Sequence, residues 1–229
     1  MRSQKLPLWI GLKAIRANLL PGLLIQALML AVVLGYYDYP PVAAWLNRLA
    51  EMKKAYGYPF SVLSAALAGA VFPEALRVVF GQKGAVRGEN LKNLLFTVPF
   101  WGFDGLSVDV FYRYQDLWFG SGVHFTTLAV KVFVDQFIFT PFYAAPLTLW
   151  AFEFRDRGYR WRGFSGVFTV DFYRSRVFPT VVAIWGVWIP LVAIIYSLPL
   201  LLQIPLFALA LSFWALLVTF IVAPQPGRA

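Results

Sequence analysis

Cysteine is absent from this 229-residue chain, and histidine occurs once, at His124. Without thiols there can be no disulfide, no thiolate nucleophile and no Cys-ligated metal site. A single histidine also argues against a His-based metal centre. Charged residues are scarce, at 14% of the chain, whereas hydrophobic residues reach 60% and mean hydropathy is +0.66. This composition excludes an ordinary soluble domain and predicts a polytopic membrane protein without metal or cofactor.

Acidic residues are also few, because 11 Asp and Glu face 20 Lys and Arg, which gives a net charge of +9. In a membrane protein such an excess usually encodes topology. A single-strand binder would interleave basic and aromatic residues along a groove, and the sequence carries no such patch. We therefore expect no nucleic acid among its partners.

Apolar runs near the roughly 20 residues that a helix needs to cross the hydrocarbon predict an all-α bundle of about six spans. We place them at Asn18 to Tyr37, Pro59 to Phe80, Leu94 to Phe119, Thr127 to Trp150, Pro179 to Leu198 and Leu200 to Val222. The prolines after residue 178 leave open one kinked span, or a re-entrant pair, over residues 179–222.

An amphipathic helix lying in the interface is predicted over residues 41–56. Its apolar positions recur at helical spacing. Its polar face is assigned to Asn47, Arg48, Glu51, Lys53 and Lys54.

With six spans, most basic residues fall on one side, together with both termini. The loop from Arg155 to Arg176 holds the largest block, and we expect it to contact anionic lipid headgroups. The bilayer is the predicted partner, with a homo-oligomer left open. A prokaryotic plasma membrane is the first expectation for the location, and a mitochondrial or peroxisomal membrane is the alternative.

Ionisable residues recur inside the predicted spans, where they usually face a bundle interior or a wet cavity and pair with one another. Opposite charges stand one helical turn apart in Glu74 with Arg77, Asp109 with Arg113, and Lys131 with Asp135. The candidate residues for a pore lining or polar interior are Glu74, Arg77, Asp104, Asp109, Arg113, Asp116, Lys131, Asp135 and Gln136. Structural bracing is an equal alternative for these residues. The small residues Ser61, Ser64, Ala65, Ala68 and Gly69 predict a face for close helix approach.

A series of motifs follows in one order along the chain: Gly105, Phe111-Tyr112, Asp116, Lys131, Asp135-Gln136, Pro141, Phe178-Pro179, Ile189-Pro190 and Trp214. From Pro59 to about Val222 this order resembles the Mpv and peroxisomal membrane protein family of small integral membrane proteins. Val182, Trp185 and Ile194 stand where that family carries polar residues. The resemblance implies a divergent member with an N-terminal extension (residues 1–57), a family-like helix bundle (58–222) and a disordered tail (223–229).

The resemblance also implies a channel or passive pore for small solutes or ions, which the ionisable residues of the spans favour independently. A membrane scaffold or stress-linked organiser without transport is the alternative. A membrane-embedded enzyme acting on lipid comes third, with Glu74, Asp104, Asp109 and His124 as acid-base candidates. Because no Ser-His-Asp order, di-acidic metal motif or HExxH occurs, we predict that the protein is not an enzyme.

Overall fold

The computed structural model describes residues 19–162 and 164–217, which form helices and turns without a strand. In chain order the elements are α2 (Leu19–Asp38), α3 (Pro40–Tyr56), α4 (Tyr58–Ala66), η1 (Leu67–Val71), α5 (Phe72–Leu76), η2 (Arg77–Gly81), α6 (Gly88–Phe119), α7 (Phe125–Val134), η3 (Asp135–Ala144), α8 (Ala145–Asp156), η4 (Phe164–Phe168), α9 (Val170–Phe172), η5 (Tyr173–Val177), α10 (Phe178–Tyr196) and α11 (Leu200–Leu217). The η segments are π-helical, apart from the 3₁₀ turn η4. The predicted all-α class is confirmed.

Five helical rods are long and apolar enough to cross a membrane. They cover Leu19–Asp38, Tyr58–Gly81, Gly88–Phe119, Phe125–Asp156 and Val170–Tyr196. Each contains most of one predicted span, and several are longer because polar helix ends extend beyond the apolar run. The chain is therefore an integral membrane protein by length and composition of its helices.

The sixth predicted span corresponds to α11, whose apolar part is the shorter helix Leu200–Ala215. Its predicted end at Val222 lies outside the described residues. A turn at Ser197–Pro199 separates α11 from α10, because proline restricts the residue before it and suits the start of a new helix. The described residues 179–217 therefore do not form one continuous kinked helix, whereas the alternative of a re-entrant pair stays a prediction.

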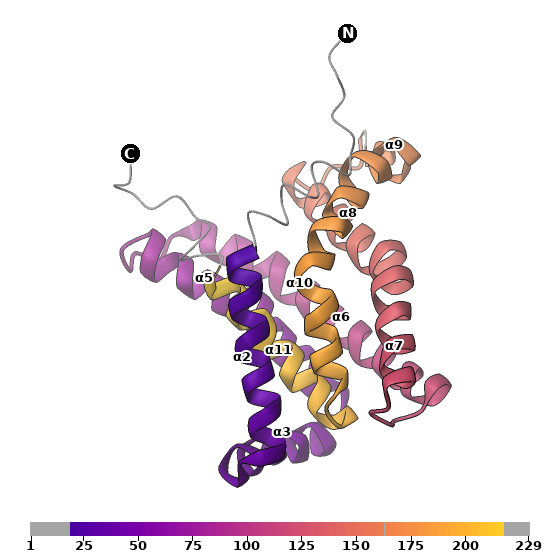
Figure 1. Cartoon of the computed structure of the whole chain (residues 1–229). Coiled ribbons are helices and arrows are strands. Elements are labelled where there is room, and N and C mark those ends of the chain that lie inside the picture. The colour runs from indigo at the N-terminus through magenta and orange to yellow at the C-terminus, as the bar shows by residue number, and fades with distance from the viewer. Residues whose placement is uncertain (1–18, 163, 218–229) are drawn as a thin grey trace.

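The rods alternate in direction, so their connections gather at two ends of the bundle (Figure 1). The connections 82–87 and 157–169 lie at what we call the arginine-rich end. At the opposite end, which we call the α3 end, α3 lies across the bundle beside the connections 120–124 and 197–199. Described basic residues of the first set of loops are Lys83, Arg87, Arg157, Arg160 and Arg162. The basic loops predicted to share one side thus lie at one end.

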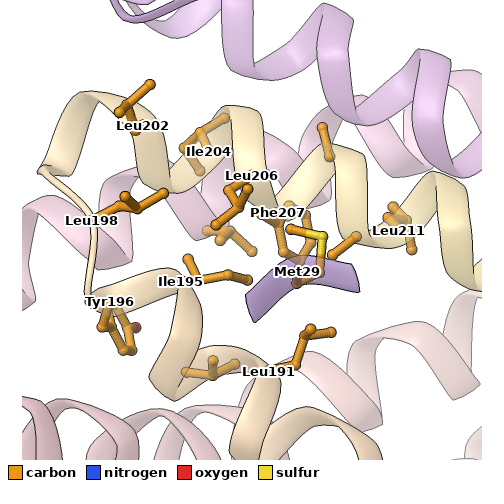
Figure 2. Close-up of a cluster of buried hydrophobic side chains, with 14 of the residues drawn as sticks. Met29, Leu191, Ile195, Tyr196, Leu198, Leu202, Ile204, Leu206, Phe207 and Leu211 are labelled. Atoms are coloured by element: carbon orange, nitrogen blue, oxygen red, sulfur yellow. The ribbon is translucent and has the colours of Figure 1, made fainter. Parts of the chain in front are cut away.

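The largest hydrophobic core joins the first described helix to the last two. Met29 of α2 is fully buried against α10 and α11, where Leu191, Ile195 and Leu206 are buried as well (Figure 2). The region predicted as an N-terminal extension thus shares a core with the C-terminal helices. Gly22 permits this approach, since a Cβ there would lie 2.8 Å from a methyl carbon of Val187 on α10.

Two residues of the predicted small-residue face bring α4 close to α6. Ser61 and Ala65 of α4 meet Gly105 of α6, where an added Cβ would lie 2.2 Å from the Cβ of Ala65 and 2.7 Å from the Ser61 carbonyl oxygen. Backbone on one side and a methyl on the other leave no flexible group to move. The prediction that this face permits close helix approach is confirmed.

We expect Gly105→Ala to lower the free energy of unfolding by about 1–3 kcal/mol, because the new methyl forces α4 and α6 apart. Thermal unfolding in detergent measures the effect. Gly88→Ala, in the same helix, is the matched control, since nothing lies within 4 Å of a Cβ at that position. Equal melting temperatures for the two variants would contradict the close contact.

Candidate functional site

The first polar cluster ties α3 to the bundle through a buried lysine. Lys53 is 1% exposed, and its ammonium donates to the Asp109 carboxylate, to the Ser61 hydroxyl at 2.6 Å and to the Gly57 carbonyl at 2.9 Å. The Ser61 hydroxyl also donates to Asp109 at 2.7 Å, and Arg113 donates to the other carboxylate oxygen at 3.1 Å. The predicted pair of Asp109 with Arg113 is confirmed, but the fully buried partner is Lys53.

Sequence reasoning missed Lys53 because the residue was assigned to the polar face of the interfacial helix. That assignment is wrong, since Leu46 and Lys53 are the two buried residues of α3. Seven residues separate them, so they share a helix face, and this spacing was the signal that could have found the site. Burial lowers the pKa of Lys53, while the hydrogen bond and the charge of Asp109 act in the opposite direction.

Glu74 is the centre of a second cluster, at the arginine-rich end. Its carboxylate is 5% exposed and accepts hydrogen bonds from the side-chain amides of Asn90 and Asn93 on α6. Arg77 approaches Glu74 to 3.6 Å but is half exposed. Glu74 therefore belongs to the polar interior, whereas Arg77 lies at its surface. Arg155 extends the cluster by donating to the Asn93 side-chain oxygen at 3.3 Å.

The third predicted pair, Lys131 with Asp135, is not formed. The buried Lys131 ammonium binds the carboxylate of Asp116 on α6. Helices α6 and α7 are antiparallel and joined by residues 120–124, so Asp116 and Lys131 lie at similar distances from the turn. An ion pair across two helices replaces the predicted pair within one helix.

Asp135 instead joins a hydrogen-bonded network across three rods. The Tyr196 hydroxyl donates to one of its carboxylate oxygens at 2.7 Å, and the Gln136 amide donates to the other at 2.8 Å. Gln115 of α6 donates to the Tyr196 oxygen at 2.5 Å. Trp185 of α10 donates to the Gln136 carbonyl at 2.7 Å. Sequence reasoning missed Gln115 and Tyr196, whose only signal was a polar group within an apolar run.

A cavity of about 390 Å³ lies between these rods. Asp104 and Tyr112 of α6 line it, together with Asp135 and Gln136 of η3. Thr140 of η3 lines it too, and π-helical segments such as η3 recur at functional sites. None of the described lysines and arginines lines the cavity. Two carboxylates therefore face a space without a basic side chain.

Asp104 differs from every other buried acid of the bundle. It is 7% exposed, and within residues 19–162 and 164–217 it has neither a hydrogen bond nor an ion pair. The side-chain oxygen of Gln136 is buried without a hydrogen-bond partner as well. Buried polar groups are normally satisfied, so both groups are places where a ligand or water would be bound.

The cavity extends from the middle of the bundle toward the arginine-rich end. Its lining runs from Tyr112 and Asp135 to Thr148 and Thr180, and Thr180 follows Arg176 by about one helical turn. Gln115 and the Lys131–Asp116 pair lie beyond Asp135 toward the α3 end and do not line it. The polar network thus forms the inner floor of the cavity.

The predicted polar interior accordingly separates into braces and a cavity lining. Asp109, Arg113, Glu74, Asp116 and Lys131 make ion pairs or hydrogen bonds between side chains, while Asp104, Asp135 and Gln136 face the cavity. Among the described residues, no group of three or more His, Asp or Glu side chains is placed to hold a metal ion.

Comparison with family models, with curated proteins and with solved structures finds no match for this chain. The resemblance to the Mpv and peroxisomal membrane protein family therefore stays a prediction. The function has to be argued from the geometry of the cavity and its polar residues.

Lys53→Met should lower the free energy of unfolding by about 3 kcal/mol or more, because it leaves the buried Asp109 carboxylate with the exposed Arg113 as its remaining charged partner. Lys54→Met is the matched control, since that neighbour is exposed and should change little. Melting temperature in detergent measures both. A small loss in Lys53→Met, equal to that in the control, would contradict the brace.

A double-mutant cycle checks the corrected partner of Lys131. Replacing Lys131 by Met should destabilise the protein less when Asp116 is also changed to Leu, because neither buried charge is then left alone. Changing Asp135 to Leu should give no such recovery. If Asp135→Leu reduced the loss of stability in Lys131→Met and Asp116→Leu did not, the result would instead support the pair of Lys131 with Asp135 that the sequence predicts.

Proposed function

We propose that the protein is a channel-like membrane protein that lets small solutes or ions cross the bilayer through this cavity. The observation that carries the proposal is Asp104, a buried carboxylate that lines a cavity inside a membrane bundle and has no partner among the described residues. Ionisable residues in such positions are costly and mark substrate or ion pathways. The resemblance to the Mpv and peroxisomal membrane protein family favours the same class of function.

A comparison of Asp104 with the buried acids that do have partners supports this interpretation. The chain satisfies the buried Asp109 and Glu74 with side chains from neighbouring helices, so it has the means to neutralise an interior acid. It does not do so for Asp104. Since an unpartnered interior charge brings no stability, a ligand or water in the cavity is the reason for keeping one.

The floor of the cavity supplies a barrier that a permeant has to pass. The Tyr196 hydroxyl bridges Asp135 to Gln115, and the Lys131–Asp116 pair lies beyond it. Hydrogen bonds between side chains can be exchanged for bonds to water or solute, whereas apolar packing cannot. We propose that this network closes the path toward the α3 end and opens by such an exchange.

Flux into liposomes tests the proposal. The reconstituted protein should release entrapped potassium or small polyols, and Thr180→Trp should lower that flux about tenfold because an indole fills the end of the cavity. Thr126→Trp is the matched control, since Thr126 is exposed at the start of α7 and does not line the cavity. Equal flux in the two variants would rule out this path.

A scaffold without transport is the second candidate, and a specific observation favours it. Lys53, Asp109 and Glu74 connect three helices by buried polar contacts, which is how a rigid membrane protein would be braced. Absence of flux from the folded, reconstituted wild-type protein would support this candidate over the channel.

A further inference from the structure

We infer that the cavity is a site for small organic cations, a methylated or alkylated ammonium group carried on a short body, with Asp104 as its counter-ion. The inference rests on the proposed function, because it names the chemical class of the solute that the cavity accepts. Four observations support it: the Asp104 carboxylate, the aromatic walls, the lack of a metal-ligand group among the described residues, and the size.

The walls of the cavity are aromatic. Trp101 of α6, Trp188 of α10 and Trp214 of α11 line it from three helices, and Phe139 and Phe207 complete the wall. The face of an indole attracts a cation through its quadrupole, and tryptophan does so more strongly than the other aromatic residues. A site with several tryptophans and a carboxylate is therefore suited to an ammonium with apolar substituents.

The position of Trp101 depends on a glycine. An added Cβ at Gly69 of η1 would lie 2.5 Å from the Trp101 ring, so the glycine leaves the space that this indole occupies. Gly69 also lines the cavity. The residue is thus a positioning residue for one aromatic wall.

The cavity does not gather acidic ligands for a bare metal cation, since among the described residues no group of three or more His, Asp or Glu side chains is placed to hold one. The hydroxyls of Thr148 and Thr180 donate to carbonyls of their own helices at 2.8 Å, and Asp135 already accepts from Tyr196 and Gln136. The Asp104 carboxylate and the Gln136 side-chain oxygen have no hydrogen-bond partner among the described residues. Calcium takes about six to eight oxygen ligands and magnesium about six, whereas an organic cation requires one counter-charge and apolar contacts.

The size fits this class. A cavity of about 390 Å³ lies near the lower end of the range of small-molecule sites, about 300–1,000 Å³. Such a space suits a compact ammonium compound. Two carboxylates and no lining lysine or arginine also disfavour an anion of the same size.

Equilibrium binding of radiolabelled choline to the purified protein in detergent tests the inference. Its neutral isostere, 3,3-dimethylbutan-1-ol, has the same shape without the charge and is measured by competition. We expect choline to bind at least about tenfold more tightly than the isostere, because cation–π contact and the Asp104 charge act only on choline.

Two substitutions examine the residues. Asp104→Asn should weaken choline binding about tenfold while leaving the affinity for the isostere unchanged. Asp156→Asn is the matched control, since Asp156 is exposed and outside the cavity. Should Asp104→Asn fail to fold, Trp214→Leu provides the second variant, and it should reduce the preference for choline over the isostere.

Three results would overturn the inference: equal affinity for choline and its isostere, which indicates an apolar cavity for lipid or detergent; no choline binding; or an unchanged affinity in Asp104→Asn. Liposome flux separates this failure from that of the proposed function. Flux of potassium or polyols without choline binding overturns the organic-cation site and leaves the channel in place. Charge-selective, Asp104-dependent choline binding without any flux supports the site and overturns the channel.

Discussion

The desolvation of charge is the constraint on which the rest of this structure depends. A carboxylate or ammonium removed from water inside a membrane bundle needs a partner of opposite charge or several hydrogen bonds. The chain answers this with Lys53 and Asp109 at the α3 end and with Glu74 and two asparagines at the arginine-rich end. Lys53 and Asp109 join elements 56 residues apart, and Glu74 joins two consecutive rods, so the same contacts that satisfy the charges also fix how the rods lie.

How much of this the sequence could predict depends on the range of the interaction. Composition and apolar runs predicted the helical membrane class and about six spans, five of which correspond to the long rods, and the small residues around Ser61 predicted a close helix contact, because each is a property of local spacing. The partner of Lys131 could not be predicted from the sequence. A lysine and an aspartate four residues apart are a valid helical pair, and only the antiparallel packing of α6 and α7 brings Asp116 closer. Lys53 was missed because a charged residue on an amphipathic helix is normally solvated.

The residues that line the cavity were likewise predictable only in part. Asp104, Asp135 and Gln136 were predicted as interior polar residues, and they do line one space. Their distinction from the bracing residues was not predictable, since Asp104 and Asp109 lie five residues apart on one helix and the buried partners Lys53 and Ser61 come to Asp109 from other helices. Tyr196 entered the network from the end of α10, where the sequence places it among apolar residues.

The bracing ion pairs and hydrogen bonds bear on how the bundle keeps the space beside Asp104. A rigid frame keeps the helices apart at a fixed distance, so the space at Asp104 cannot collapse to neutralise the charge internally. The packing of α2 against α10 and α11 fixes the two C-terminal helices as well. If the proposed organic-cation site exists, the binding of a cation at Asp104 would supply the counter-charge that the described residues do not provide. The desolvation of the Asp104 carboxylate would then lower the stability of the protein without a cation and raise the affinity of the site for one.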